Sequence, residues 1–211
     1  MKAVIFSGGR APSLSLVKSE LEDADVLIAV DSGGNYLRDN GIIPDFLVGD
    51  FDSINPVTLE FFRNSSCKVH EYPKDKDFTD TELALELAVK LNSDTIIFLG
   101  CTGTRLDHVI GNLGLLRTCI EMEISGYIKD DHNIIMLSKA PLKLTGKRGS
   151  TFSVQAFCDT VNNLSIKGAK YPLYDHKLIL GDPLTISNEF LDEEVEIYFT
   201  DGLLMVLYSR D

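Results

Sequence analysis

Tryptophan is absent from this chain of 211 residues, and cysteine is scarce. The four cysteines lie far apart and form no Cys-x-x-Cys pair: Cys67, Cys101, Cys119 and Cys158. This spacing argues against a zinc knuckle or a redox-active dithiol. Free, buried thiols in a reducing compartment are the simplest interpretation, and we therefore expect a cytoplasmic protein.

Positive charge and long apolar runs are also in short supply. The chain has 20 Lys and Arg residues against 32 Asp and Glu residues, which gives a formal net charge of −12. This balance disfavours nucleic acid or an anionic membrane surface as the main partner, because both need basic patches. No apolar run approaches the roughly 20 residues that span a bilayer. The short run at residues 3–6 fits a buried strand better than a signal peptide.

Two phosphate-binding fingerprints are missing as well. Neither a Gly-x-Gly-x-x-Gly sequence nor a Walker P-loop occurs, which disfavours a dinucleotide-dependent dehydrogenase and a P-loop kinase. A nucleotide ligand remains compatible with the acidic composition, because metal ions can bring a triphosphate to carboxylates.

The first 125 residues alternate between short apolar runs and helical patterns. Strands are predicted at 2–6, 26–30, 46–48 and 95–99, and helices at 13–21, after 34, from 56, at 81–91 and at 106–120. This alternation predicts a parallel sheet with helices on both faces, in a Rossmann-like α/β domain.

Residues 126–211 show a different pattern, with short strand signals separated by turn signals such as Asp201-Gly202. Strands are predicted at 134–137, 142–144, 151–157, 161–166, 177–180, 196–199 and 203–208. No helical period longer than about two turns appears. We therefore predict a second domain that is an all-β sandwich.

Polar segments follow the predicted strands of the first domain, at the sheet edge where open parallel sheets bind ligands. In residues 31–34 (DSGG), two glycines would let the backbone approach a ligand, although a tight strand-to-helix turn alone explains them better. In residues 49–53 (GDFDS), an extended backbone would point Asp50 and Asp52 to the same side. Paired carboxylates repel unless a cation lies between them, and Mg²⁺ suits such ligands. A solvated acidic turn is the alternative.

Two further segments carry mixed charges. Residues 74–80 (KDKDFTD) place three aspartates and two lysines before a predicted helix, a mixture that suits a metal-bound triphosphate. Thr79 or Asp80 could instead simply cap that helix. Residues 100–108 (GCTGTRLDH) contain Arg105, which offers a bidentate phosphate contact. Asp107 there could be only a helix-start anion, and His108 only a structural residue.

Taken in this order, the four segments resemble the thiamine pyrophosphokinase family. The resemblance spans most of the chain and includes a fifth segment, residues 186–190 (ISNEF). Members have an α/β catalytic domain followed by a β-sandwich domain. The resemblance implies that residues 1–125 form an ATP-binding catalytic domain and residues 126–211 a thiamine-binding domain. It also implies a homodimer with the active site at the subunit interface.

The resemblance assigns a role to individual residues. It places Mg²⁺ and the triphosphate of ATP on Asp50, Asp52 and Asp80. The implied ATP-site residues are Asp31, Gly33, Lys76, Asp77, Thr79, Arg105, Asp107 and His108. Ser187 and Asn188 would hold the thiamine pyrimidine from the partner subunit, although composition alone would make them an ordinary polar turn. Some members stack thiamine on Trp, so this chain must use another group or lack the contact.

The implied reaction is attack of the thiamine hydroxyl on the β-phosphorus of ATP, with AMP leaving. Asp52, through the metal, and Arg105 would compensate the developing charge. Asp80, or else Asp107, would accept the hydroxyl proton. Two alternatives stay open: a metal-dependent nucleotide phosphohydrolase and a non-catalytic nucleotide-sensing module.

Overall fold

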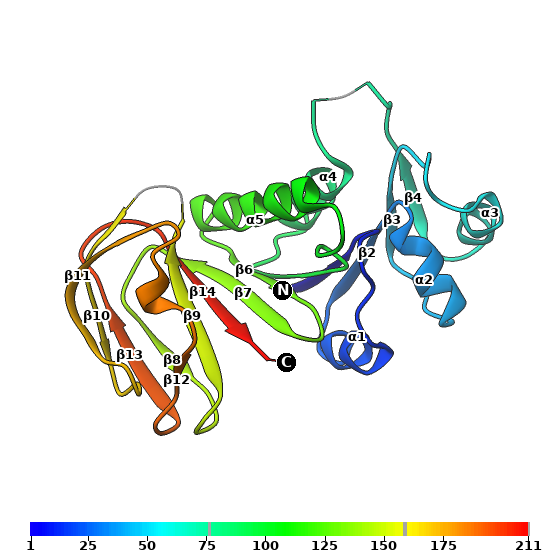
Figure 1. Cartoon of the computed structure of the whole chain (residues 1–211). Coiled ribbons are helices and arrows are strands. Elements are labelled where there is room, and N and C mark those ends of the chain that lie inside the picture. The colour runs from blue at the N-terminus through cyan, green and yellow to red at the C-terminus, as the bar shows by residue number, and fades with distance from the viewer. Residues whose placement is uncertain (76, 158–159, 211) are drawn as a thin grey trace. The chain divides into compact units, whose positions relative to one another are not determined.

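The computed structural model describes residues 1–75, 77–157 and 160–210. Lys76, one of the predicted ATP contacts, lies outside the described residues. The chain divides into two compact units, Met1–Asp131 and His132–Asp211. Most elements of each unit are labelled in Figure 1.

The first unit contains six strands that run parallel to their neighbours, in the order β6-β5-β1-β2-β3-β4. The strands are β1 Lys2–Phe6, β2 Val26–Val30, β3 Phe46–Gly49, β4 Lys68–Glu71, β5 Thr95–Leu99 and β6 Ser125–Lys129. The helices are α1 Leu14–Leu21, α2 Gly33–Asp39, α3 Pro56–Arg63, α4 Asp80–Lys90 and α5 Leu106–Glu121. A helix follows each of the first five strands.

Helices cover this sheet because its strands are apolar on both faces. One face packs against the first three helices, through Val17 of α1, Leu37 of α2 and Phe62 of α3, around strand residues such as Phe6 and Leu47. Helix α4 packs on β1, β2 and β3, and α5 packs on β6. In Figure 1, α4 and α5 lie on the opposite side of the sheet from α1.

The chain order reverses between β1 and β5. Strands β1 to β4 progress in one direction, and the chain then returns to place β5 on the other side of β1. In open α/β sheets, ligands bind outside the carboxyl ends of the strands at such a reversal. The loops that follow β1 and β5 are therefore the first place to look for a site.

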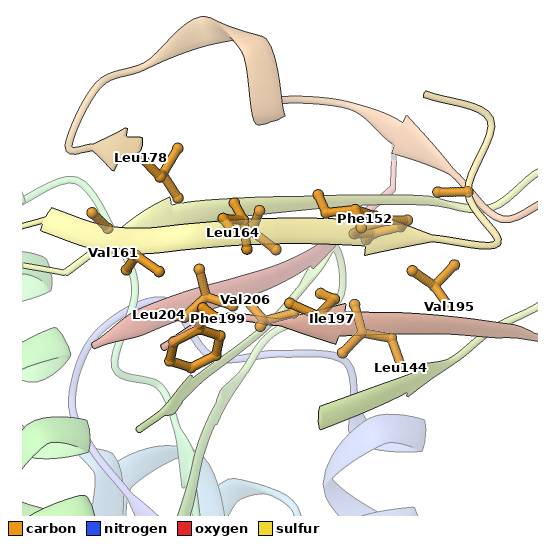
Figure 2. Close-up of a cluster of buried hydrophobic side chains, with 14 of the residues drawn as sticks. Leu144, Phe152, Val161, Leu164, Leu178, Val195, Ile197, Phe199, Leu204 and Val206 are labelled. Carbon is orange, nitrogen blue, oxygen red and sulfur yellow. The ribbon is translucent and has the colours of Figure 1, made fainter. Parts of the chain in front are cut away.

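The second unit is antiparallel. Its strands are β7 Asn133–Ser138, β8 Leu142–Thr145, β9 Thr151–Ala156, β10 Thr160–Lys167, β11 Leu173–Ile179, β12 Asn188–Glu189, β13 Glu194–Tyr198 and β14 Leu204–Ser209, with a short 3₁₀ helix, η1, at Pro183–Thr185. Within this unit, β12-β9-β14-β7 pair in that order, and β11-β10-β13-β8 form a second array. Figure 2 shows side chains from both arrays in one core, including Phe152, Leu164 and Val206.

The mixed α/β class predicted from the sequence is confirmed. Three strands were not predicted, namely β4, β6 and β12, and β11 begins at Leu173 although the prediction placed it at 177–180. The sequence predicts a domain boundary after residue 125, and this boundary stays a prediction. By its contacts the chain divides after Asp131, so β6, which pairs with β5, belongs to the first unit. None of the described helices is long and apolar enough to cross a membrane.

Candidate active site

Four predicted site residues come from four different loops of the first unit. Asp31 follows β2, Asp50 follows β3, Asp80 opens α4 after β4, and Arg105 lies between β5 and α5. The strands are parallel, so all four loops leave the same edge of the sheet. The fold therefore gathers residues that are far apart in the sequence.

Three carboxylates meet at this edge. Asp31, Asp50 and Asp52 each offer an oxygen, and these oxygens all lie within 4.8 Å of one another. The backbone N–H of Asp52 donates to Asp50 Oδ1 at 3.1 Å. Phe51 has a φ of 60°, so the segment is a left-handed turn and not the extended backbone that the sequence argument assumed. The two aspartates thus come together by a different geometry.

Asp31 is the most constrained member of this group. Its φ is 45°, and its backbone N–H donates to the carbonyl of Val48 at 2.9 Å. The Ser53 hydroxyl donates to Asp31 Oδ2, whereas Asp31 Oδ1 is buried and has no hydrogen-bond partner among the described residues. Burial raises the pKa of Asp31, the Ser53 hydrogen bond opposes this, and the nearby charges of Asp80, Asp50 and Asp52 raise it further.

An unpaired, buried carboxylate oxygen beside two more carboxylates fits a hard divalent cation. The sequence resemblance named Asp50, Asp52 and Asp80 as metal ligands, and the structure brings Asp31 to the first two. Asp80 lies near enough to act on the pKa of Asp31. The donor set is chemically suited to Mg²⁺, and the ligand roles stay predictions.

The loop before α4 includes the residue that caps this helix. Thr79 caps α4: its hydroxyl accepts from the N–H of Glu82 at 3.2 Å, and the Glu82 carboxylate accepts from the N–H of Thr79 at 2.7 Å. Asp77 is exposed, and Lys74 Nζ lies 3.7 Å from Asp52 Oδ2. Capping therefore explains Thr79 locally, and its contact with a phosphate stays a prediction.

Arg105 and Asp107 are exposed and paired with each other. Arg105 Nη2 donates to Asp107 Oδ2 at 2.6 Å, and its Nε donates to Oδ1 at 3.3 Å. The Arg105 hydrogen bond lowers the pKa of Asp107, and Asp107 raises the pKa of Arg105. His108, the next residue of α5, is exposed. Arg105 would have to share or leave Asp107 to bind a phosphate.

Gly33 has a packing role. A Cβ at this position would lie 2.5 Å from the Phe6 carbonyl oxygen and 3.0 Å from the Ser7 carbonyl oxygen. A larger residue would therefore push the start of α2 away from the end of β1. A border role in an ATP site remains a prediction for Gly33.

The loop after β1 was not among the segments predicted for the site. The N–H of Gly9 donates to the Gly100 carbonyl at 2.8 Å, and the N–H of Arg10 donates to the Thr102 carbonyl at 2.7 Å. These bonds hold exposed Arg10 against the loop that leads to Arg105. The glycine pair directly after a strand was the signal that could have found this loop.

In the second unit, the predicted thiamine contacts differ from each other. Ser187 is exposed, with a φ of 57°. Asn188 is buried at 4% exposure, and its amide is bonded to the backbone of Tyr171, accepting from the N–H at 3.1 Å and donating to the carbonyl at 2.8 Å. Asn188 therefore holds the turn that presents the exposed ring of Tyr171.

The chain is thus a two-unit α/β protein. Its parallel α/β unit carries an acidic group suited to a metal ion, and an antiparallel β unit follows along the chain. The family model for the thiamin pyrophosphokinase catalytic domain matches residues 17–128, and the model for the thiamin pyrophosphokinase vitamin B1 binding domain matches residues 138–204. The thiamine pyrophosphokinase of Bacillus subtilis (strain 168) is 32% identical over 100% of both chains.

Solved structures agree. A crystal structure of thiamine pyrophosphokinase from Bacillus subtilis superposes with a TM-score of 0.89 at 30% identity, covering 100% of both chains. One from Geobacillus thermodenitrificans superposes with a TM-score of 0.86 at 29% identity, covering 100% of this chain and 98% of the other. The chain belongs to the thiamine pyrophosphokinase family.

Proposed function

We propose that the protein transfers the pyrophosphate of ATP to the hydroxyl of thiamine, giving thiamine pyrophosphate and AMP. The observation that carries this proposal is the acidic edge of the first unit, where Asp31 keeps a buried oxygen unpaired beside Asp50 and Asp52. The matched vitamin B1 binding domain supports thiamine as the acceptor. ATP is the co-substrate that the family assignment supports.

Asp31, Asp50 and Asp52 would hold Mg²⁺, with Asp80 close by. When bound, the ion would neutralise charge on the phosphates and on the transition state. By holding that ion, the carboxylates would place the triphosphate end of ATP at the edge of the sheet. Among the described residues, Lys74 lies beside only one of these carboxylates, Asp52, so a bound cation would relieve most of their mutual repulsion, and metal and nucleotide should bind together.

Side chains of the protein would accept the proton of the thiamine hydroxyl and bind the phosphates. Asp80 is the better proton acceptor for the thiamine hydroxyl, because Asp107 is held by Arg105, which lowers the pKa of Asp107. Arg105 would keep Asp107 as a partner and offer its remaining guanidinium N–H groups to the phosphates. Arg10, held beside the same loop, is a second cation for this role. Lys76, Asp77, Thr79 and His108 complete the proposed ATP site, which Asp31 and Gly33 border.

The proposed domains follow the two units. The first is a Rossmann-like, ATP-binding catalytic domain, and the second is a sandwich of two antiparallel arrays that binds thiamine. Ser187 would contact thiamine, and Asn188 would act by holding Tyr171. The exposed Tyr171 ring then offers an aromatic surface for a cationic thiamine in a chain without Trp. We place the protein in the cytoplasm.

We further propose a homodimer with the active site shared between subunits. Asp52→Asn and Asn188→Ala damage different units of the chain. If each site takes one unit from each subunit, a mixed dimer contains one intact site and one site with both changes. At thiamine concentrations low enough that each variant alone is nearly inactive, random mixing should therefore restore about a quarter of wild-type activity per site, because two-fold symmetry makes the sites equivalent. Sites built within single subunits would restore nothing, even with subunit exchange shown by native mass spectrometry.

The direct test is incubation of the pure protein with ATP, Mg²⁺ and thiamine, followed by mass analysis. We expect thiamine pyrophosphate and AMP in equal amounts. A phosphohydrolase would release phosphate or pyrophosphate without thiamine, and a sensing module would bind ATP without turnover. Either result would replace the proposed function with the corresponding alternative.

A further inference from the structure

A pair of buried hydroxyl groups joins the end of β1 to the first turn of α4. Ser7 Oγ and Thr81 Oγ1 lie 3.1 Å apart, and the two residues are only 5% and 8% exposed. Ser7 directly follows β1, and its backbone N–H donates to the Leu99 carbonyl of β5 at 2.8 Å. Thr81 is the second residue of α4, next to Asp80.

The other side chains that α4 buries are apolar. These are Leu83, Ala84, Leu85 and Ala88. The buried Cys101 thiol also hydrogen-bonds Ser7, and burial raises the pKa of Cys101 to about 12, so this thiol is neutral. Apolar contacts have no preferred direction, whereas a hydrogen bond has a defined distance and angle. The hydroxyl pair therefore gives the start of α4 a directional contact with the end of β1.

The position of this first turn matters because Asp80 begins it. Asp80 opens α4 at the same edge of the sheet as the loops that carry Asp31 and Asp50, and its charge is one of those that raise the pKa of Asp31. A movement of the first turn of α4 relative to β1 would change the distance between Asp80 and the other carboxylates. Catalytic steps are sensitive to such shifts of about 1 Å.

We propose that the Ser7–Thr81 hydroxyl pair is a positioning element that sets Asp80 against Asp31 and Asp50. This inference rests on the proposed function, in which these carboxylates serve pyrophosphate transfer. Both hydroxyls act through Asp80 and are positioning groups. Apolar packing alone would keep α4 on the sheet but would not fix its first turn.

The test is a double-mutant cycle in the full chain, with Ser7→Ala, Thr81→Val and the two combined. Ser7→Ala removes the partner of the buried Thr81 hydroxyl, and Thr81→Val leaves the Ser7 hydroxyl with only the weakly hydrogen-bonding Cys101 thiol. Each single change should therefore lower the Tm by several degrees. The double variant removes both hydroxyls, and its Tm returns most of the way to the wild-type value. Its kcat/KM stays at least about tenfold low, because Asp80 is no longer held in place.

A second readout does not depend on turnover. Mn²⁺ replaces Mg²⁺ as a spectroscopic probe, and its affinity is measured by electron paramagnetic resonance without nucleotide. We expect the double variant to bind Mn²⁺ several-fold more weakly than the wild type. A structural role alone would recover with the Tm and would leave both kcat/KM and Mn²⁺ affinity unchanged.

Two control variants sharpen the cycle. Ser93 is a buried serine just beyond the other end of α4, and its Oγ has no hydrogen-bond partner among the described residues. Ser93→Ala should therefore keep wild-type activity and Mn²⁺ affinity, with a Tm that is unchanged or slightly higher. Thr81→Ser keeps the hydroxyl and should stay within about twofold of wild-type kcat/KM.

A double variant with wild-type activity and Mn²⁺ affinity would overturn the proposal, as would one whose Tm stays as low as the single variants. If the double variant does not fold, Thr81→Ser decides: an impairment equal to that of Thr81→Val overturns the role of the hydroxyl. If the wild type forms no thiamine pyrophosphate, the proposed function fails, whereas the Mn²⁺ affinities still test the positioning role.

Discussion

Two groups of polar side chains, one in each unit, differ in whether their polar atoms have partners. In the first unit, Asp31, Asp50 and Asp52 stand together, and one buried oxygen of Asp31 has no partner among the described residues. In the second unit, Gln155 and Asn188 are buried with both ends of their amides bonded to the backbone. The first arrangement is electrostatically incomplete without a cation, and the second is complete by itself.

The complete network supports a loop whose outer side is apolar. Gln155 Nε2 donates to the Asp182 carbonyl at 2.8 Å, and Gln155 Oε1 accepts from the N–H of Gly181 at 2.8 Å. The exposed residues of this loop include Leu180, Leu184 and Ile186. The comparison shows that one unit keeps unpaired charge at its sheet edge, whereas the other exposes apolar and aromatic groups on a polar frame whose hydrogen bonds are satisfied.

The largest expected effect comes from removing charge in the incomplete unit. Asp52→Asn should lower kcat by more than about 100-fold, because charge stabilisation by a bound metal is worth several kcal/mol. The Tm should stay the same or rise slightly, since one repelling charge is gone. Steady-state kinetics and thermal melts measure both. Near wild-type turnover at limiting Mg²⁺ would contradict the metal role.

A matched control is available on the same unit. Asp39 is exposed at the C-terminal end of α2. The acidic group lies near the other end of this helix, because Asp31 precedes its first residue. Asp39→Asn removes the same charge and should leave kcat within about twofold of wild type. An equal loss in both variants would point to overall charge and not to the site.

The second largest effect is expected from disrupting the satisfied hydrogen bonds of the second unit. Asn188→Ala removes the amide that pairs with both backbone groups of Tyr171, and leaves these groups without their partner. The expected loss of stability is about 2 kcal/mol, or a Tm fall of about 4–8 °C. We also expect KM for thiamine to rise more than kcat falls. Ser187→Ala is the control, and its Tm should be unchanged, because Ser187 is exposed.

The sequence predicted which loops carry the candidate site better than it predicted the conformation of those loops. Strand-helix alternation located the loops that carry Asp50 and Arg105, because parallel strands place their carboxyl ends together. The period-two argument for Asp50 and Asp52 assumed extended backbone, and the left-handed φ of Phe51 shows that this premise was wrong. The Ser53 bond to Asp31 and the Asn188 bonds to Tyr171 depend on tertiary packing, which no local pattern reveals.

The fold was predictable wherever the pattern was strong. Residues 2–6 and 95–99 form strands β1 and β5 with the predicted bounds, because continuous apolar runs mark strands covered on both faces. Strand β4 (KVHE) was missed because it lies at the edge of the parallel strands and its residues are polar or partly exposed. Strand β12 has two residues, too few for any periodicity.

A smaller effect is expected at the exposed cation of the first unit. Arg105→Lys keeps the charge but loses the planar fork that now holds Asp107. The kcat/KM for ATP should fall about tenfold, which corresponds to about 1.4 kcal/mol. Arg148→Lys, at an exposed turn of the second unit, is the control. If lysine serves as well as arginine at position 105, bidentate phosphate binding is the wrong explanation.

The smallest effect is expected from removing the charge of Asp31, which tests whether this carboxylate lacks a compensating positive charge when no metal ion is bound. The pKa of Asp31 is raised in the folded protein, so its ionised form at neutral pH costs stability. Asp31→Asn removes that charge, and Asn tolerates the left-handed φ of 45° at this position. With a chelator present at pH 7, we expect the Tm of the variant to exceed the wild-type value by about 1–3 °C.

The pH dependence gives the sign of this last prediction. Stability of the wild type should rise relative to the variant as the pH falls through the raised pKa of Asp31, above its ordinary 3.8, because the folded state then takes up a proton. The Tm difference should therefore vanish in acid. Excess Mg²⁺ at pH 7 should stabilise the wild type more than the variant. A variant that is less stable than the wild type in chelator would show that Asp31 is already compensated within the chain, and the contrast between the units would disappear.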